Sequence, residues 1–286
     1  MPSLIDIRRR IRSVKNTQQI TKAMKMVSAA KLRRAQDRVI AARPYAAMLR
    51  KVLADVAGAV AALDQPVENP LLAQREERRT LLVLITGDKG LAGAFNTNLI
   101  KGAQRFAAER AGATVTFELI GRKGRDFFRK RGAAIAGDHI GLAAKVAYAD
   151  TAAIAHQAMD LFRNDEIDAV YLLYNEFKSV MAQRLTITRV LPVAMPEQSA
   201  PADFIFAQPP AEMLGRLLPR YVEMEFYRAL LESAAAEHAA RMTAMDSATS
   251  NAAEMIEKLT LYMNRVRQAS ITKEIIEVVS GAAAGE

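Results

Sequence analysis

Apolar residues recur at alternating spacings of three and four along both ends of the chain, the pattern of helices that pair in a left-handed coiled coil. The first run extends from about Ser3 to Leu63 and the second from about Arg220 to Ser280. Either run, if unbroken, would form a helix roughly 90 Å long, far longer than a helix in an ordinary globular domain. Because one run precedes the middle of the chain and the other follows it, we expect the paired helices to be antiparallel.

The pairing face of the first run changes character partway along. From Gln18 to Ser28 the positions on that face are polar, whereas the apolar residues lie on a neighbouring face: Ile20, Ala23, Met24 and Val27. We therefore expect the first helix to change what it packs against in this stretch. Pro44 lacks a backbone N–H, so we also expect the helix to bend or end there.

The second run has two notable features. Pro219 would fit in the first turn of its helix, where a missing N–H costs little. The run ends in an apolar segment that contains Ile275, Ile276, Val278 and Val279. Two interpretations of that segment stay open, namely packing against the first helix or insertion into a socket on another protein.

Between the two runs, strands alternate with helices, which is typical of a largely parallel sheet. Thr80–Thr86 is a strongly apolar strand that a glycine-containing turn follows. We expect further strands at Thr114–Ile120, Ala169–Tyr174 and Arg184–Val190, and helices at Asn96–Arg110, Arg122–Arg131 and Tyr148–Phe162. The five prolines of Leu191–Pro210 predict a linker.

These patterns predict an α/β protein in which a long antiparallel coiled coil of the N- and C-terminal helices accompanies a central Rossmann-like α/β domain. The expected domains are an N-terminal coiled-coil helix at residues 1–63, a central domain with its linkers at residues 64–210, and a C-terminal coiled-coil helix at residues 211–286.

The net charge of +9 is unevenly distributed. Residues 1–50 hold thirteen Lys or Arg and two acidic residues, a net charge of +11, whereas residues 51–209 carry +1 and residues 210–286 carry −3. The first helix therefore holds the whole excess, and its field favours an acidic partner. One alternative is a nucleic-acid-binding coiled-coil adaptor. Against it, this helix contains a single aromatic residue, Tyr45, and its basic residues point all round the helix.

Little in the sequence indicates catalysis within this chain. Cysteine is absent, and the spacing of His139, His156 and His238 does not suggest metal ligands. The Gly87–Gly93 loop follows a strand, where phosphates often bind, but its glycines fit neither the P-loop nor the dinucleotide spacing. A nucleotide-binding enzyme is therefore the weakest alternative. We expect no catalytic residue, no metal and no cofactor.

Neither a membrane span nor a signal peptide is expected. Charged residues interrupt every apolar run within a dozen residues. At the N-terminus, Asp6 and the run Arg8-Arg9-Arg10 lead into an amphipathic helix without an apolar block. We interpret the start as mature sequence.

Three segments resemble the gamma subunits of F-type ATP synthases, and the similarity extends over essentially the whole chain in the same order. They are IRSVKNTQQITKAMKMVSAAKLRRAQ (Ile11–Gln36), GDKGLAGAFN (Gly87–Asn96) and RQASITKEIIEVVSGAAA (Arg267–Ala284). The resemblance implies a non-catalytic central-stalk rotor subunit that couples proton-driven rotation of a membrane ring to ATP synthesis and hydrolysis. The implied partners are the alpha and beta subunits of the catalytic ring, the epsilon subunit and the membrane rotor ring. The implied location is peripheral, on the cytoplasmic face of a bacterial plasma membrane.

The resemblance also implies site residues. Arg8–Lys25 and Arg241–Thr272 would face the catalytic ring, including acidic loops of the beta subunits. The implied contacts within these ranges are Arg8, Arg9, Arg10, Lys15, Met24, Lys25, Arg241, Gln268 and Thr272. Phe204 and Phe206 would contact the membrane rotor. No direct contact with nucleotide or nucleic acid is implied.

Overall fold

The computed structural model describes residues 3–62, 69–194 and 208–283. The chain divides into two compact units, one of residues 1–28 with 242–286 and the other of residues 29–241. Two long helices, α1 (Leu4–Ala62) and α5 (Pro210–Ala283), contribute to both units and contact each other, as expected from the heptad pattern. From Leu4 onwards, the described residues of the smaller unit all belong to these two helices, whereas the larger unit also holds the sheet.

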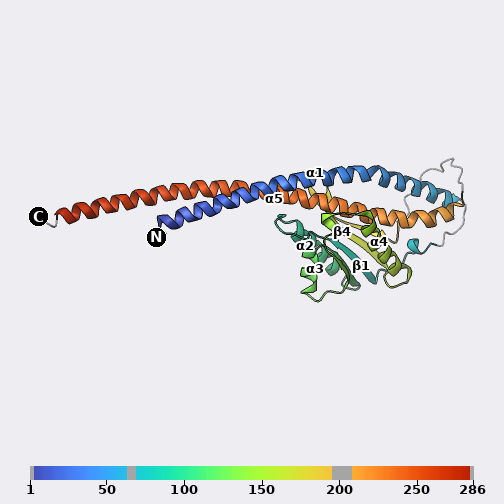
Figure 1. Cartoon of the computed structure of the whole chain (residues 1–286). Coiled ribbons are helices and arrows are strands. Elements are labelled where there is room, and N and C mark those ends of the chain that lie inside the picture. Colours follow the sequence, from blue (N-terminus) through green and yellow to red (C-terminus); the bar gives the residue numbers. More distant parts are fainter. Residues whose placement is uncertain (1–2, 63–68, 195–207, 284–286) are drawn as a thin grey trace. The chain divides into compact units, whose positions relative to one another are not determined.

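The sheet of the larger unit has five strands in the order β3-β2-β1-β4-β5. Figure 1 labels its two neighbouring strands β1 and β4. The strands are β1 (Arg79–Ile85), β2 (Thr114–Ile120), β3 (Ile135–His139), β4 (Ala169–Phe177) and β5 (Gln183–Leu191). The first four run parallel, and β5 is antiparallel to β4. The helices of this unit other than α1 and α5 are α2 (Phe95–Glu109), α3 (Arg122–Arg129) and α4 (Tyr148–Arg163), with short 3₁₀ turns at Pro70–Leu72 and Leu142–Ala144.

The largely parallel sheet is confirmed, and the expected strands and helices agree with it to within a few residues. The strand β3 was not predicted from the sequence. Its side chains alternate between half-buried and exposed, and its sequence IAGDH lacks the apolar run of a central strand. Because β3 lies at the edge of the sheet, the strand needs little apolar character to form.

The core of the larger unit forms where helices cover both faces of β1. The side chains of Leu81–Ile85 are at most 2% exposed. Right-handed crossovers place α2 and α3 on one face of a parallel sheet and, after the strand order reverses, α4 on the other. Figure 1 shows these helices on opposite sides of the strands. Buried helix residues close the two layers, among them Leu99, Phe106, Met159 and Phe162.

Two prolines lie inside the long helices. Pro44 lies inside α1, which continues through it to Ala62, so the expectation that the helix could end there was wrong. Pro44 is exposed, and the carbonyl group that loses its N–H partner can therefore bind water. α5 begins at Pro210 rather than near Arg220, which places Pro219 inside the helix instead of in its first turn.

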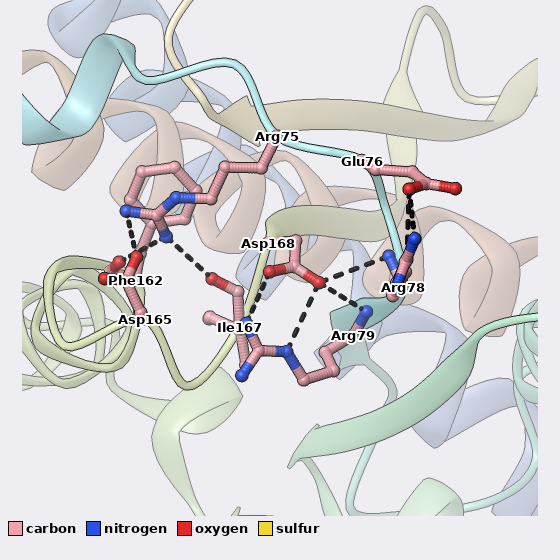
Figure 2. A network of polar contacts seen from close by, with 8 residues as sticks. All are labelled: Arg75, Glu76, Arg78, Arg79, Phe162, Asp165, Ile167 and Asp168. Carbon is pink, nitrogen blue, oxygen red and sulfur yellow. Dashed lines mark hydrogen bonds and ion pairs between the residues drawn. The ribbon is translucent and has the colours of Figure 1, made fainter.

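A polar network holds the segment before β1 against the loop between α4 and β4 (Figure 2). The carboxylate of Asp168 accepts hydrogen bonds from the backbone N–H groups of Arg78 and Arg79, at 3.2 and 2.7 Å, and from the Arg79 guanidinium at 2.7 Å. Arg75 donates to the carbonyl oxygens of Phe162 and Ile167, at 2.8 and 3.2 Å. The network therefore positions the start of the central strand.

We expect Asp168→Asn to destabilise the protein at neutral pH. The Arg79 guanidinium, which donates to Asp168, lowers the pKa of this carboxyl group below its usual value. A carboxyl group with a lowered pKa in the folded state contributes stability above its unfolded pKa of about 3.9, and this stability is lost as the pH falls through the folded value. The variant should lose about 1–3 kcal/mol near neutrality and show a shallower decline in stability at acid pH.

Denaturant unfolding of the full chain across the acid range measures this effect. Asp160→Asn is the matched control, because the Asp160 side chain is 63% exposed and its one ion pair with a described residue is to Arg163 on the same helix. If the free energy of unfolding falls with acid pH as steeply in Asp168→Asn as in the unmodified chain, the role assigned to the network is contradicted.

Candidate functional site

The smaller unit pairs the two helices through polar residues. Thr21 Oγ1 lies 2.8 Å from Thr249 Oγ1, and Lys25 Nζ lies 2.6 Å from Asp246 Oδ1. Residue numbers rise on α1 as they fall on α5, so the helices are antiparallel, as expected. The expected change of packing face between Gln18 and Ser28 was wrong. Polar residues stay on the pairing face because α5 offers complementary polar groups there.

An apolar strip of α1 is exposed as a consequence. Thr21 and Ser28 are buried, whereas Ile20 and Val27 are 60% and 56% exposed and Ala23 is exposed as well. Met26 is 62% exposed. An apolar strip on an otherwise basic helix is typical of a surface that other proteins contact.

The first turns of α1 carry free positive charge. Ser3 and Asp6 form a reciprocal cap, in which Ser3 Oγ donates to Asp6 at 2.7 Å and the Asp6 N–H donates to Ser3 Oγ at 3.2 Å. These hydrogen bonds from Ser3 lower the pKa of Asp6. The basic residues that follow are exposed and have no ion pair with described residues: Arg8, Arg9, Arg10 and Lys15. Met24 and Lys25, which the resemblance also implies as contacts, are half-buried.

α5 extends past the start of α1. If the pairing seen at Thr21 and Lys25 continues, Leu4 lies opposite about Val266, and α5 continues for about 17 residues, or about 25 Å, beyond that point. Gln268 and Thr272 are exposed there. The apolar end of α5 is exposed too, with Ile275 58% and Val279 62% accessible, so packing against the first helix is excluded for this segment.

In the larger unit, α5 crosses the carboxyl end of β1. Ser233 Oγ donates to the carbonyl oxygen of Ile85, the last residue of β1, at 3.5 Å. The Glu237 carboxylate lies against Gly87, where an added Cβ would be 2.8 Å from Glu237 Oε1. Arg241 pairs with Glu237 and approaches the carbonyl oxygen of Gly90 at 3.4 Å, with its side chain only 11% exposed. Arg241, like Lys25, is therefore engaged within the chain, and its side chain is the more buried of the two.

This arrangement bears on the loop at Gly87–Gly93. The order of the strands reverses between β1 and β4, and the crevice at such a point is where open α/β sheets bind ligands. Here Glu237 of α5 lies in it, and a carboxylate repels the phosphates that such loops usually bind. The sequence reasoning missed Glu237. Its i, i+4 spacing from Arg241 was the only available signal.

Four glutamates of α5 are buried among apolar neighbours, and three have a partner. Glu223 accepts from Tyr148 and lies 3.0 Å from His156 Nε2, which joins α5 to α4. Glu225 pairs with Arg228 at 2.6 Å, and Glu237 pairs with Arg241. The remaining one, Glu232, has a buried oxygen without a hydrogen-bond partner.

The histidines have structural partners of their own. His139 Nε2 lies 2.6 Å from the buried Glu118, and His156 contacts Glu223. Burial lowers the pKa of His238 to about 4, with further contributions from the charges of Arg241 and Lys31. Over residues 3–62, 69–194 and 208–283, the His, Asp and Glu side chains form no group that could hold a metal ion.

Two further expectations concern membranes. None of the helices in the described part of the chain is both long and apolar enough to cross a bilayer. Phe204 and Phe206, the implied contacts to a membrane rotor, lie outside the described residues.

Comparisons with known proteins identify close relatives. A protein family described as ATP synthase matches residues 3–284. The ATP synthase gamma chain of Solibacter usitatus is 79% identical over the full length of both chains. That of Anaeromyxobacter sp. is 52% identical over 99% of both chains.

Solved structures agree at greater distance. A chain from the central stalk and c-ring of the Tetrahymena thermophila mitochondrial ATP synthase matches 80% of this chain and 99% of its own length, with a TM-score of 0.59 at 26% identity. A chain of the Euglena gracilis mitochondrial ATP synthase matches 98% of this chain and 94% of its own, with a TM-score of 0.69 at 19% identity, which shows the fold alone.

Proposed function

Because the chain belongs to the ATP synthase gamma-chain family, we propose that its two long helices couple proton-driven rotation of a membrane ring to ATP synthesis and hydrolysis in the ring of alpha and beta subunits. The chain is a rotor subunit of the central stalk and a non-catalytic part of ATP synthase. In this proposal residues 1–63 and 211–286 form the shaft, residues 64–210 form the foot, and catalysis stays in the beta subunits.

Coupling of this kind needs a shaft that contacts each catalytic subunit differently as it turns, because contacts shift a conformational equilibrium only as far as they differ between states. The charge and exposure of α1 support the proposal. Arg8, Arg9, Arg10 and Lys15 are exposed cations that form no ion pair with described residues, and the apolar strip follows them along α1. Acidic loops of the beta subunits would complement these cations.

The remaining contacts follow from the same proposal. Met24, Lys25, Gln268 and Thr272 would face the catalytic ring. Arg241 would act chiefly by holding α5 to the β1 loop. The foot would bind the epsilon subunit and, through Phe204 and Phe206, the membrane rotor ring. The chain would then lie at the cytoplasmic face of a bacterial plasma membrane without crossing it.

The observation that carries the proposal is the exposed apolar end of α5, beyond the start of α1, since an apolar surface of this kind marks a site that another protein covers. The test is expression with the other subunits of the same ATP synthase. The full chain should co-purify with three copies each of two larger nucleotide-binding subunits, and the complex should make ATP when a proton gradient is imposed on vesicles. Recovery of the chain alone, or synthesis by complexes that lack it, would refute the proposal.

We expect Ile275→Gln combined with Val279→Gln to weaken reassembly of the chain with the alpha and beta subunits. Both side chains are more than half exposed, and burying an aliphatic side chain is worth about 1.5–3 kcal/mol when complete. Losing the partial burial of two aliphatic side chains should lower the affinity for the ring about tenfold, which titration of labelled chain into the ring measures. Glu274→Gln with Glu277→Gln is the control, because it changes neighbouring exposed positions without loss of apolar surface. Equal effects of the two pairs would contradict an apolar socket.

A further inference from the structure

A cavity of about 490 Å³ opens in the larger unit between α1, α5 and the end of β4. This volume lies within the range of about 300–1,000 Å³ that is typical of ligand pockets. Part of the wall is apolar, with Val39, Phe177 and Leu231. The rest is charged, from six side chains: Arg43, Arg50, Glu176, Lys178, Arg228 and Glu232. Four cations thus face two carboxyl groups.

Two of the four cations in the wall form ion pairs, and the other two leave an excess of positive charge at the cavity. Lys178 Nζ lies 2.6 Å from Glu176 Oε1, and Arg228 Nη2 lies 2.6 Å from Glu225 Oε2 behind the wall. Arg43 and Arg50 make no ion pair with any residue that the structure describes. They are seven residues apart on α1, so both guanidinium groups lie on the same side of that helix.

Two buried polar atoms in the wall also lack partners, Glu232 Oε2 and Arg228 Nε. Glu232 is only 4% exposed. Burial raises the pKa of this carboxyl group, and so does Glu176, while Arg228, Arg43 and Lys178 act in the opposite direction. A protonated Glu232 would donate a hydrogen bond, as Arg228 Nε does. Buried donors without acceptors are costly, so an acceptor that enters the cavity would be favoured.

We propose that this cavity binds the phosphate or carboxylate group of a small anion, which Arg43 and Arg50 hold from α1 while Arg228 donates from α5. Guanidinium groups match both kinds of oxyanion with paired hydrogen bonds. The apolar wall and the volume leave room for an organic part beyond the charged group. Because the ligand would join α1, α5 and the end of β4, it would stiffen the larger unit.

The anionic group belongs either to a free metabolite or to the acidic side chain of a neighbouring subunit. In both cases an oxyanion binds to the same guanidinium groups. The probe is pyrophosphate, titrated by calorimetry into the full chain and, separately, into the assembled complex. Binding to the full chain should saturate with a Kd of about 1 mM or below. In the complex, the nucleotide sites of the larger subunits also take pyrophosphate, so only the binding that Arg43→Gln with Arg50→Gln removes is counted. Such binding by chain and complex alike would identify a free anion, whereas such binding by the chain alone would identify an acidic side chain that fills the cavity on assembly.

The decisive variant is Arg43→Gln with Arg50→Gln, which should weaken pyrophosphate binding at least about tenfold. Both side chains are exposed, so the change should leave folding intact. The control is Arg12→Gln with Arg33→Gln, which removes the same charge from exposed positions of α1 that do not line the cavity. An equal loss in the control would show a general charge effect and overturn the proposal. Absence of saturable binding by the unmodified chain would overturn it as well.

Discussion

Replacing Arg241 with methionine should lower the free energy of unfolding by about 3–5 kcal/mol, because it leaves the buried carboxylate of Glu237 without its cation. The two side chains are 11% and 9% exposed, so water reaches neither freely. The same change removes contacts to the carbonyl oxygen of Gly90 and should loosen α5 from the carboxyl end of β1. Denaturant unfolding of the full chain measures the loss.

The double variant Arg241→Met with Glu237→Gln separates two roles of Arg241. It removes the stranded charge, so most of the lost stability should return. If Arg241 acts only by neutralising Glu237, coupling of proton flow to ATP hydrolysis should recover together with stability. If stability returns while coupling stays low, Arg241 acts through its contacts to Gly90 or through another subunit. A single variant as stable as the unmodified chain would contradict the anchoring role.

The largest effect on assembly is expected from neutralising the exposed cations at the start of α1. Changing Arg8, Arg9, Arg10 and Lys15 to glutamine should reduce affinity for the alpha and beta ring by about 100-fold, since each exposed pair contributes up to about 1 kcal/mol. The deficit should narrow as ionic strength rises, because salt screens the attraction in the unmodified protein. Titration of labelled chain into the ring at several salt concentrations measures both effects, and proton-driven synthesis by reconstituted vesicles should fall in parallel.

A matched variant distinguishes the site from the overall charge. Lys101, Arg105, Arg129 and Lys130 are exposed on α2, on α3 and directly after α3, and changing them to glutamine removes the same charge. We expect this variant to bind the ring nearly as the unmodified chain does. If it loses affinity to the same extent, net charge rather than the start of α1 drives assembly.

The strongly periodic parts of the chain were predictable. Leu81–Ile85 is too apolar for anything but a buried strand, and the heptads of α1 and α5 determine two long paired helices. Family membership also resolved the alternative of a nucleic-acid-binding adaptor, which had rested on charge alone. Prediction from local sequence failed where the structure of a segment depended on the segment packed against it. The polar stretch at Thr21 stayed on the pairing face because Thr249 meets it, and β3 formed because β2 offered an edge.

The fold class, the two long helices, the basic start of α1 and the family could be predicted from the order of the amino acids alone. The reason is that these features depend on periodicity, composition and local order along the chain. The folded structure was needed to show that α5 places Glu237 and Arg241 at the end of β1 and that the apolar end of α5 is exposed. It was also needed to show that one cavity is lined by Arg43, Arg50, Arg228 and Glu232. Such contacts join residues up to about 190 positions apart, and their energies depend on burial and on the partner, which no local pattern records.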